Sequence, residues 1–149
     1  MKVCITVADG GHLTEMLLLM EAFQGEETFF ITYEGIRSTE LKNHFKVYTI
    51  PNFIGHSFSF VLNFTKMIYI LLWERPSVLV STGSEIAIPL FYFAWAMGIR
   101  TIFIETLARI RRPSFTGKMV YPISNLFLVQ WEELARVYGK KAKYWGNVL

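Results

Sequence analysis

Short runs of apolar residues alternate with longer stretches of helical periodicity along this chain. Seven of the runs are four to six residues long and rich in β-branched and aromatic side chains, which predicts β-strands. These strands are expected over residues 2–7, 28–33, 46–51, 77–82, 101–105, 126–130 and 142–145. Apolar positions at helical spacing predict helices over residues 12–24, 57–73 and 86–98.

This order of elements predicts the fold class. Strands separated by helices are typical of βαβ units and of a mainly parallel sheet. The strands are apolar almost throughout, which is typical of a sheet covered on both faces. We therefore expect an α/β fold with a Rossmann-like, mainly parallel sheet and helices on both faces. A chain of 149 residues fits one domain, so residues 1–149 are expected to form a single unit.

Composition narrows the class further. Apolar residues make up 52% of the chain, which is rich for a soluble protein, but charges interrupt them too often for an integral membrane bundle. The single cysteine, Cys4, excludes an internal disulfide and fits a reducing compartment. No signal peptide is expected, because Lys2 leads directly into a strand and Asp9 breaks the apolar run.

Charge is unevenly distributed. Residues 1–99 carry six basic and nine acidic side chains, whereas residues 100–149 carry nine basic and three acidic ones. This asymmetry indicates an anionic partner such as a phosphate group, an anionic lipid surface or nucleic acid. The alternative is a basic face that is merely solvated.

The first candidate site is "ADGGH" (residues 8–12), which we name the glycine loop. It follows the first strand, and ligands of open α/β sheets bind beyond the carboxyl ends of the strands. Gly10 and Gly11 let the backbone approach a ligand, and the next helix starts with free N–H groups that suit phosphate. His12 can donate to phosphate or act as an acid or base. The alternative is an ordinary strand-to-helix turn. The loop matches neither a dinucleotide-binding nor a Walker pattern.

Two further loops end at the same expected edge. After the fourth strand, Thr82, Gly83 and Ser84 offer a glycine and hydroxyls to a ligand, although Ser84 can also simply cap the next helix. After the fifth strand, Glu105 ends an apolar run, where a carboxylate is costly unless it is paired or working. It is either a general base or a partner for an arginine. The basic residues beyond it match phosphate geometry: Arg109, Arg111, Arg112 and Lys118.

The two longest predicted helices carry more apolar surface than one sheet contact requires. In residues 57–73, Ser59, Asn63 and Lys66 form one narrow polar stripe. An excess apolar face with basic residues nearby indicates contact with a membrane surface without crossing it. The alternatives are a buried core helix or a subunit interface. The side chains expected at the membrane are Phe58, Phe60, Phe64, Trp73, Phe91 and Trp95.

Three segments resemble one known family. "GGHLTEML" (residues 10–17), the segment of residues 104–134 with its Thr-Gly-Lys and Val-Gln-Trp-Glu motifs, and "YGKKAKYWGNVL" (residues 138–149) occur in the order found in the asparagine-linked-glycosylation-fourteen family and its PssD-type capsule relatives. The resemblance covers nearly the whole chain. Two departures are Asp9, where the family often has a small residue, and Thr106, which replaces a serine.

The resemblance implies the amino-terminal half of a GT-B glycosyltransferase, similar to the acceptor-binding half of MurG. The expected function is a membrane-associated, acceptor-binding subunit of a two-chain enzyme. That enzyme would add GlcNAc or another hexose from a UDP-sugar to a polyprenyl- or dolichyl-diphosphate-linked sugar, in N-glycan or surface polysaccharide synthesis. The alternative is a non-catalytic membrane scaffold that recruits and stabilises the catalytic chain.

The family motifs also imply roles for residues. His12 and Glu105 would be catalytic. The acceptor diphosphate would be bound by Gly10, Gly11, Thr82, Gly83, Ser84, Arg109, Thr116 and Lys118. Expected partners are a donor-binding second GT-B half, the lipid-linked acceptor and a membrane surface, with no nucleic acid, metal or cofactor. The chain lacks the amino-terminal anchor of many relatives, so a peripheral position on the cytoplasmic face of a membrane is expected.

Overall fold

The computed structural model describes residues 1–51 and 57–148, and their side chains except those of residues 57–61. Its centre is a seven-stranded sheet in the order β3-β2-β1-β4-β5-β6-β7. Every neighbouring pair of these strands is parallel. The strands are β1 (Lys2–Thr6), β2 (Glu27–Tyr33), β3 (Lys46–Ile50), β4 (Val78–Ser81), β5 (Arg100–Ile104), β6 (Leu126–Val129) and β7 (Ala142–Tyr144).

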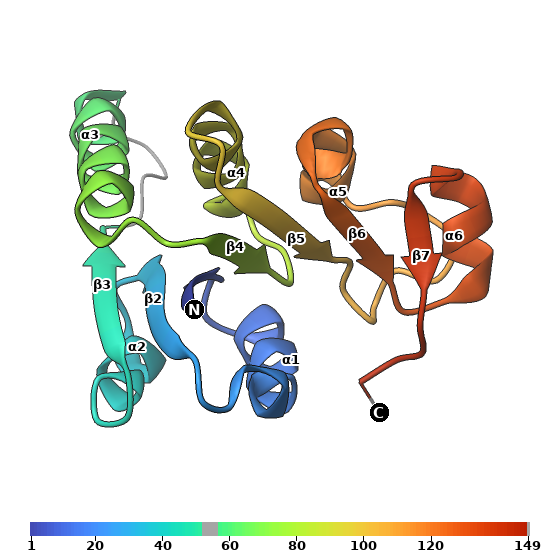
Figure 1. The fold of residues 1–149 in the computed structure, drawn as a ribbon, viewed down its shortest axis with the longest axis horizontal. Helices are drawn as coiled ribbons and strands as arrows, with labels where there is room; N and C mark the ends of the chain where they lie inside the picture. Colours follow the sequence, from blue (N-terminus) through green and yellow to red (C-terminus); the bar gives the residue numbers. More distant parts are fainter. Residues whose placement is uncertain (52–56, 149) are drawn as a thin grey trace.

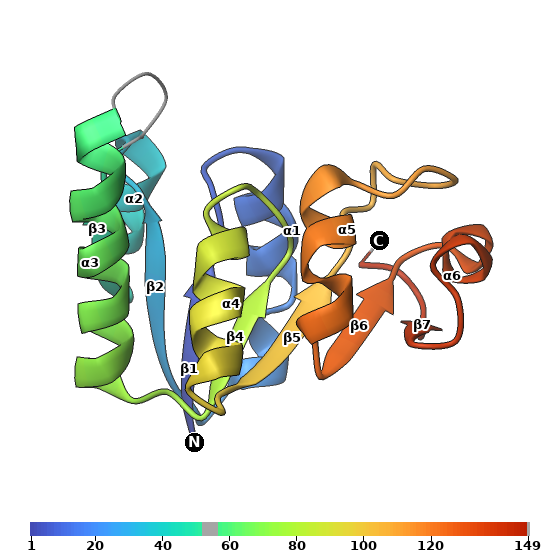
Figure 2. The same cartoon turned by 90° about the horizontal axis from the view of Figure 1, so that it is seen from above.

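Helices cover both faces of this sheet. They are α1 (Gly11–Leu18), α2 (Ile36–Leu41), α3 (Ser57–Glu74), α4 (Ala87–Ala96), α5 (Phe115–Val120) and α6 (Glu132–Tyr138), with 3₁₀ turns at Met20–Phe23 and Tyr121–Ile123. The two views show α1 and α2 on one face and α3, α4 and α5 on the other (Figure 1 and Figure 2). The predicted fold class is therefore confirmed.

All seven predicted strands are present, each within one residue of its predicted bounds at either end. The helix predicted over residues 12–24 is two elements, because α1 ends at Leu18 and a 3₁₀ turn follows. Three short helices, α2, α5 and α6, were not predicted. Each is six or seven residues long, too short for a clear helical period.

Two apolar layers hold the sheet and helices together. Under α3 to α6 the core is aromatic: the rings of Phe103 and Phe127 stack with centroids 5.1 Å apart, and Phe91 meets Phe103 edge-on at 5.9 Å. Under α1 and α2 the core is mostly aliphatic, with Leu13 and Met16 of α1 fully buried. The single cysteine, Cys4, is a free thiol in the first of these layers.

The outer surface of α3 and α4 carries large apolar side chains. We name the most exposed of them, Leu62, Tyr69, Leu72, Trp73 and Trp95, the tryptophan patch. Thr65 and Lys66 are exposed there as well. Trp73 is 70% exposed and Trp95 is 59% exposed. A hollow of about 540 Å³ separates Leu72 of α3 from the residues just after α4. No helix among the described residues is long and apolar enough to cross a bilayer.

Asn63 and Lys66 of the polar stripe predicted along α3 bond the neighbouring strand, although Lys66 is exposed, and the side chain of Ser59 lies outside the described residues. Asn63 is buried and donates a hydrogen bond to the carbonyl of Pro51 at 3.2 Å, and Lys66 Nζ donates to the carbonyl of Thr49 at 2.7 Å. These two hydrogen bonds join α3 to the end of β3 and to the residue that follows it. The exposed side of the helix carries large apolar side chains at Leu62, Tyr69 and Trp73 beside the exposed Lys66.

Of the six side chains expected at the membrane, Phe91 is wrongly predicted, and Trp73 and Trp95 are exposed. Phe91 is fully buried, because it shares the inner face of α4 with Leu90 and Ala94. Phe64 is half-buried and meets Phe93 edge-on, with centroids 4.5 Å apart. The side chains of Phe58 and Phe60 lie outside the described residues.

An ion cluster around the buried carboxylate of Glu74 lies at the opposite edge from the loops. The Glu74 side chain at the end of α3 is 2% exposed, and Lys2 and Lys46, from the first residues of β1 and β3, approach it at 3.0 and 2.5 Å. The Tyr48 hydroxyl also donates to it. Burial raises the pKa of Glu74, but the hydrogen bonds from Lys46, Tyr48 and Lys2 outweigh it and lower this pKa to about 2. The cluster thus joins α3 to two strands.

Replacing Glu74 by glutamine is expected to lower the free energy of unfolding by about 1–3 kcal/mol near pH 7, because two lysines lose their counter-charge. Urea unfolding measures it, with exposed Glu21→Gln as the control. The folded pKa lies below the unfolded value, so the advantage of the wild type exists above about pH 5 and disappears as pH falls toward 2. An advantage that persisted at low pH would contradict this assignment.

Candidate functional site

The strand order reverses between β1 and β4, and this switch point brings two of the predicted loops together. The glycine loop follows β1, and Thr82 follows β4. His12 Nδ1 lies 3.0 Å from the carbonyl oxygen of Thr82, and Thr82 Oγ1 donates to the carbonyl of His12 at 2.7 Å. Two reciprocal hydrogen bonds therefore connect residues 70 positions apart.

This geometry determines the tautomer of His12. A carbonyl oxygen can only accept, so Nδ1 carries the proton and donates to Thr82. In the neutral ring Nε2 then carries the lone pair, and it has no hydrogen-bond partner within the described part of the chain. The ring is half-buried. His12 can consequently take a proton from a group that approaches Nε2.

Gly83 and Ser84 shape the space beside this ring. An added Cβ at Gly83 would lie 2.5 Å from Cε1 of His12, and its φ of +131° disfavours other residues. Ser84 also has a positive φ, +85°, and its buried hydroxyl has no partner in the described structure. The prediction that Ser84 caps α4 is wrong, since that helix has no side-chain cap. An unusual backbone with an unpaired hydroxyl is typical of functional sites.

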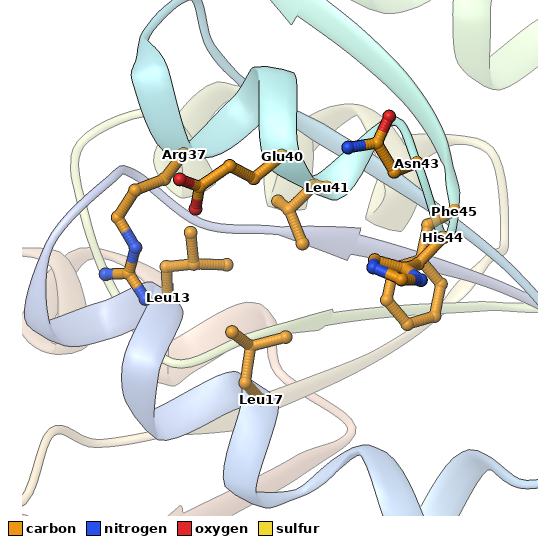
Figure 3. A pocket seen from close by; sticks show the side chains of 8 residues that line it. All are labelled: Leu13, Leu17, Arg37, Glu40, Leu41, Asn43, His44 and Phe45. Atoms are coloured by element: carbon orange, nitrogen blue, oxygen red, sulfur yellow. The ribbon is translucent and has the colours of Figure 1, made fainter.

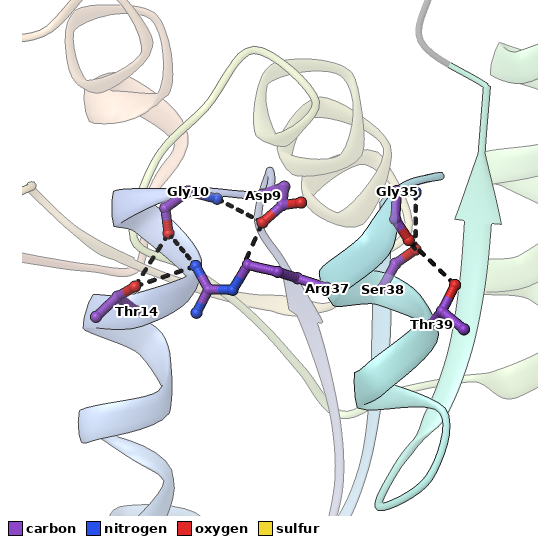
Figure 4. Close-up of polar contacts among 7 residues, drawn as sticks. All are labelled: Asp9, Gly10, Thr14, Gly35, Arg37, Ser38 and Thr39. Atoms are coloured by element: carbon purple, nitrogen blue, oxygen red, sulfur yellow. Dashed lines mark hydrogen bonds and ion pairs between the residues drawn. The ribbon is translucent and has the colours of Figure 1, made fainter.

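The glycine loop is held from the side of α2. Arg37 Nη1 donates to the carbonyl of Gly10 at 2.8 Å and to Thr14 Oγ1 at 3.1 Å (Figure 4). Asp9 accepts from its neighbour, the Gly10 N–H, at 2.7 Å. Gly10 has a φ of +101°, and an added Cβ at Gly11 would meet no atom within 4 Å. The loop is therefore open above Gly11.

Glu105 does not have the surroundings of a general base. It has no exposed surface, and its two carboxylate oxygens accept hydrogen bonds from the Thr106 N–H, the Ser114 N–H and hydroxyl, and the Tyr138 hydroxyl. These bonds are 2.5 to 3.1 Å long. Its expected role next to a substrate hydroxyl is thus corrected: the carboxylate is enclosed by the fold. Its partners are hydroxyls and amides instead of the expected arginine.

The enclosure of Glu105 holds the following loop in place. Burial and the hydrogen bond to Glu105 raise the pKa of Tyr138 well above its usual value. Ser114, which donates to the carboxylate, also accepts from the Gly117 N–H at 2.8 Å and so caps α5. One buried carboxylate therefore connects β5, α5 and α6.

The basic residues after β5 lie on an open surface. Arg109, Arg111 and Arg112 are exposed, and none of the three forms an ion pair with another described residue. They line a shallow hollow of about 480 Å³. On α5, Lys118 is exposed and Thr116 is buried. A ligand can therefore reach the three arginines, whereas Thr116 is enclosed by the fold.

Another hollow, of about 420 Å³, lies outside the predicted site. It separates α1 from α2, and its walls are mainly apolar (Figure 3). Leu13 and Leu17 come from α1, and Arg37 and Leu41 come from α2. The stem of Arg37 therefore borders this hollow while its guanidinium reaches the glycine loop.

Comparison of the sequence with known proteins identifies a family and several relatives. The family described as "Oligosaccharide biosynthesis protein Alg14 like" matches residues 3–148. This chain belongs to that family. A relative from Debaryomyces hansenii, named "UDP-N-acetylglucosamine transferase subunit ALG14", is 29% identical over 99% of this chain and 76% of its own length. The protein of the same name from Saccharomyces cerevisiae is 24% identical over 98% of this chain and 76% of its own.

Solved structures share the fold of this Alg14-like chain. Acinetobacter baumannii MurG superimposes with a TM-score of 0.80 at 15% identity, over 99% of this chain and 45% of its own. A UDP-N-acetylglucosamine 2-epimerase from Rickettsia bellii gives 0.78 at 14% identity, again over 99% and 45%. The chain therefore spans less than half the length of these two proteins. The likeness confirms the expected Rossmann-like architecture of a GT-B half.

Glu15, which was not predicted as a site residue, connects α1 of the Alg14-like chain to the loops after β5 and β6. Its carboxylate accepts from Thr106 Oγ1 at 2.7 Å, from the Leu107 N–H and from Gln130 Nε2 at 3.1 Å. Gln130 also donates to the backbone carbonyl of Glu105 at 3.0 Å. Glu15 and Gln130 both lie within the segments that carry the family resemblance. That shared position is the feature of the sequence that could have identified them as site residues.

Gly117→Ala tests the enclosure of Glu105. An added Cβ would lie 2.1 Å from the Tyr138 hydroxyl and 2.4 Å from Glu105 Oε2, so one of these buried groups must move. We expect the free energy of unfolding to fall by at least about 2 kcal/mol, measured by urea denaturation. Gly11→Ala, where the added methyl meets open space, is the matched control. Equal stability of the two variants would contradict the packing described here.

Proposed function

We propose that this chain is the acceptor-binding subunit of a two-chain glycosyltransferase. The enzyme transfers a sugar, GlcNAc in the first instance, from a UDP-sugar to a polyprenyl- or dolichyl-diphosphate-linked sugar. This chain binds the lipid-linked acceptor, and a second Rossmann-like polypeptide binds the nucleotide sugar. Residues 1–149 act as one acceptor-binding and membrane-associating domain, which has little activity alone.

One observation carries this proposal: the glycine loop and the fixed ring of His12 lie together at the switch point of the sheet. The amides at the start of α1, an eight-residue helix, suit the acceptor diphosphate. The exposed arginines of residues 109–112 add positive charge beyond β5. The relatives are named as subunits of a UDP-N-acetylglucosamine transferase, which supports both the donor and the need for a second chain.

In the proposed reaction the acceptor hydroxyl attacks the anomeric carbon of the UDP-sugar. The new carbon–oxygen bond forms as the bond from that carbon to the UDP oxygen breaks, and UDP leaves with the electron pair. The hydroxyl proton passes to Nε2 of His12, which the hydrogen bond from Nδ1 to Thr82 leaves unprotonated. Glu105 acts by holding the loop that follows it, through Ser114 and Tyr138.

A second function, a scaffold that only recruits and stabilises the catalytic chain, is favoured by the enclosure of Glu105. That enclosure removes one of the two expected catalytic side chains of this half. The two functions differ in what they require of His12, because a scaffold needs its fold and surface but no proton acceptor at Nε2.

We further propose that the chain associates peripherally with the cytoplasmic face of a membrane through the tryptophan patch. Trp73 and Trp95 expose large amphipathic rings, and Arg75 follows α3 on the exposed surface. Aromatic side chains of this type favour the interface between lipid and water. The free thiol of Cys4 supports a reducing compartment.

His12→Ala separates the two functions. In the complex with the donor-binding chain, assayed with UDP-GlcNAc and a short-chain polyprenyl-diphosphate-GlcNAc, kcat is expected to fall roughly 10²–10⁴-fold because the proton acceptor is lost. Size-exclusion chromatography should show the complex intact. His44→Ala, at an exposed histidine after α2, is the matched control with unchanged kcat. Preserved transfer by His12→Ala would support the scaffold instead.

Replacing Trp73 and Trp95 together by alanine is expected to weaken binding to phosphatidylcholine–phosphatidylglycerol vesicles roughly tenfold or more, because the apolar area that enters the interface is lost. Vesicle co-sedimentation measures this. Trp145→Ala, at a tryptophan that is 71% exposed at the other end of the sheet, is the control and should bind like the wild type. If all three proteins sediment equally, the patch is not the membrane-binding surface.

A further inference from the structure

We propose that Arg37 is a positioning residue, which holds the glycine loop in the conformation that receives the acceptor diphosphate. This inference rests on the proposed function and adds a residue to it. Arg37 belongs to α2, which neither the predicted elements nor the predicted site included. Its effect on the reaction is exerted through the backbone of Gly10.

The contacts of Arg37 span the turn of the glycine loop. Nη1 donates to the Gly10 carbonyl at 2.8 Å and to Thr14 Oγ1 at 3.1 Å, and Nε lies 3.6 Å from Asp9 Oδ1 (Figure 4). One guanidinium therefore contacts Asp9, Gly10 and, in the first turn of α1, Thr14. The rigid fork of arginine suits several acceptors at once.

The loop needs such support because it contributes little packing of its own. Glycine has the largest backbone freedom to lose on folding, and the site around Gly11 is empty within 4 Å of an added Cβ. The Gly10 carbonyl already accepts the first α1 hydrogen bond, from the Thr14 N–H at 3.1 Å. Arg37 adds a charged donor to the same oxygen, and charge-assisted hydrogen bonds are the stronger kind.

The start of α2 is built to place Arg37 there. The Ser38 hydroxyl accepts from the Gly35 N–H at 2.9 Å and donates to the Gly35 carbonyl at 2.8 Å, and Ser38 is buried (Figure 4). An added Cβ at Gly35 would lie only 3.3 Å from Asp9 Oδ2. The absence of a side chain at Gly35 thus lets α2 approach the glycine loop closely, two residues before Arg37.

His12 lies between two supports that come from different elements. On one side its ring and carbonyl are bonded to Thr82, and on the other side Arg37 holds Gly10 two residues earlier. Loss of Arg37 leaves the support from Thr82 intact but releases the backbone of the glycine loop before His12. We therefore expect acceptor binding to suffer more than the proton transfer at Nε2.

The experiment measures KM for acceptor and donor separately in the complex with the donor-binding chain, using the substrates named above. Arg37→Gln is expected to raise the acceptor KM roughly tenfold or more, with kcat changed less than about threefold and the donor KM unchanged. Arg37→Lys keeps one donor and the charge, and should restore part of the affinity. Arg136→Ala, which removes an exposed arginine with an ion pair on α6, is the matched control.

A second readout reports the loop itself. Hydrogen–deuterium exchange of the peptide that covers residues 8–14 should be faster in Arg37→Gln than in the wild type, and unchanged in Arg136→Ala. Thr14→Val removes one of the acceptors of Arg37 and also the bond that Thr14 Oγ1 donates to the Gly10 carbonyl at 3.2 Å, so its effect should add only in part to that of Arg37→Gln in the double variant.

The outcomes separate the two proposals. If the wild-type complex transfers sugar and Arg37→Gln has an unaltered acceptor KM, or raises both KM values equally, the positioning role is overturned and the proposed function stands. If the wild-type complex transfers no sugar, the proposed function fails and the positioning role fails with it. Faster exchange together with a selective rise in acceptor KM supports both.

Discussion

The reciprocal pair of hydrogen bonds between His12 and Thr82 is the constraint on which the site depends. These bonds are possible because β1 and β4 are neighbours in the sheet although 70 residues separate the bonded pair. They fix the ring, determine its tautomer and direct a free Nε2 away from Thr82. Gly83 completes the arrangement, because any side chain there would occupy the space of the imidazole.

A second set of buried contacts determines where the other loops lie. The carboxylates of Glu15 and Glu105 accept hydrogen bonds from the loops after β5 and β6, and Gln130 connects the two. Both carboxylates find hydrogen-bond donors within the protein, and these bonds hold the segments after β5 and β6 in place. Beside this framework His12 is half-buried, and Arg109, Arg111 and Arg112 are exposed.

The strands were predictable because each is a short apolar run bounded by turn residues, and all seven occur within a residue of the expected bounds. The roles of side chains that depend on tertiary contacts were not predictable from the sequence. Phe91 looked like surplus apolar surface, yet the helical phase of α4 turns it toward Phe103. Asn63 and Lys66 were predicted only as part of a polar stripe, and nothing in the sequence indicated that they bond the carbonyls of Pro51 and Thr49. Glu105 looked poised to react, but the hydroxyls of Ser114 and Tyr138 arrive from positions that no local pattern indicates.

The most direct test of the account is a structure of the two-chain complex with a short-chain polyprenyl-diphosphate-linked sugar. The account predicts that the diphosphate lies against the free amides at the start of α1, with the accepting hydroxyl within hydrogen-bond distance of His12 Nε2. A diphosphate bound on the other chain, or on this chain away from the glycine loop, would contradict it.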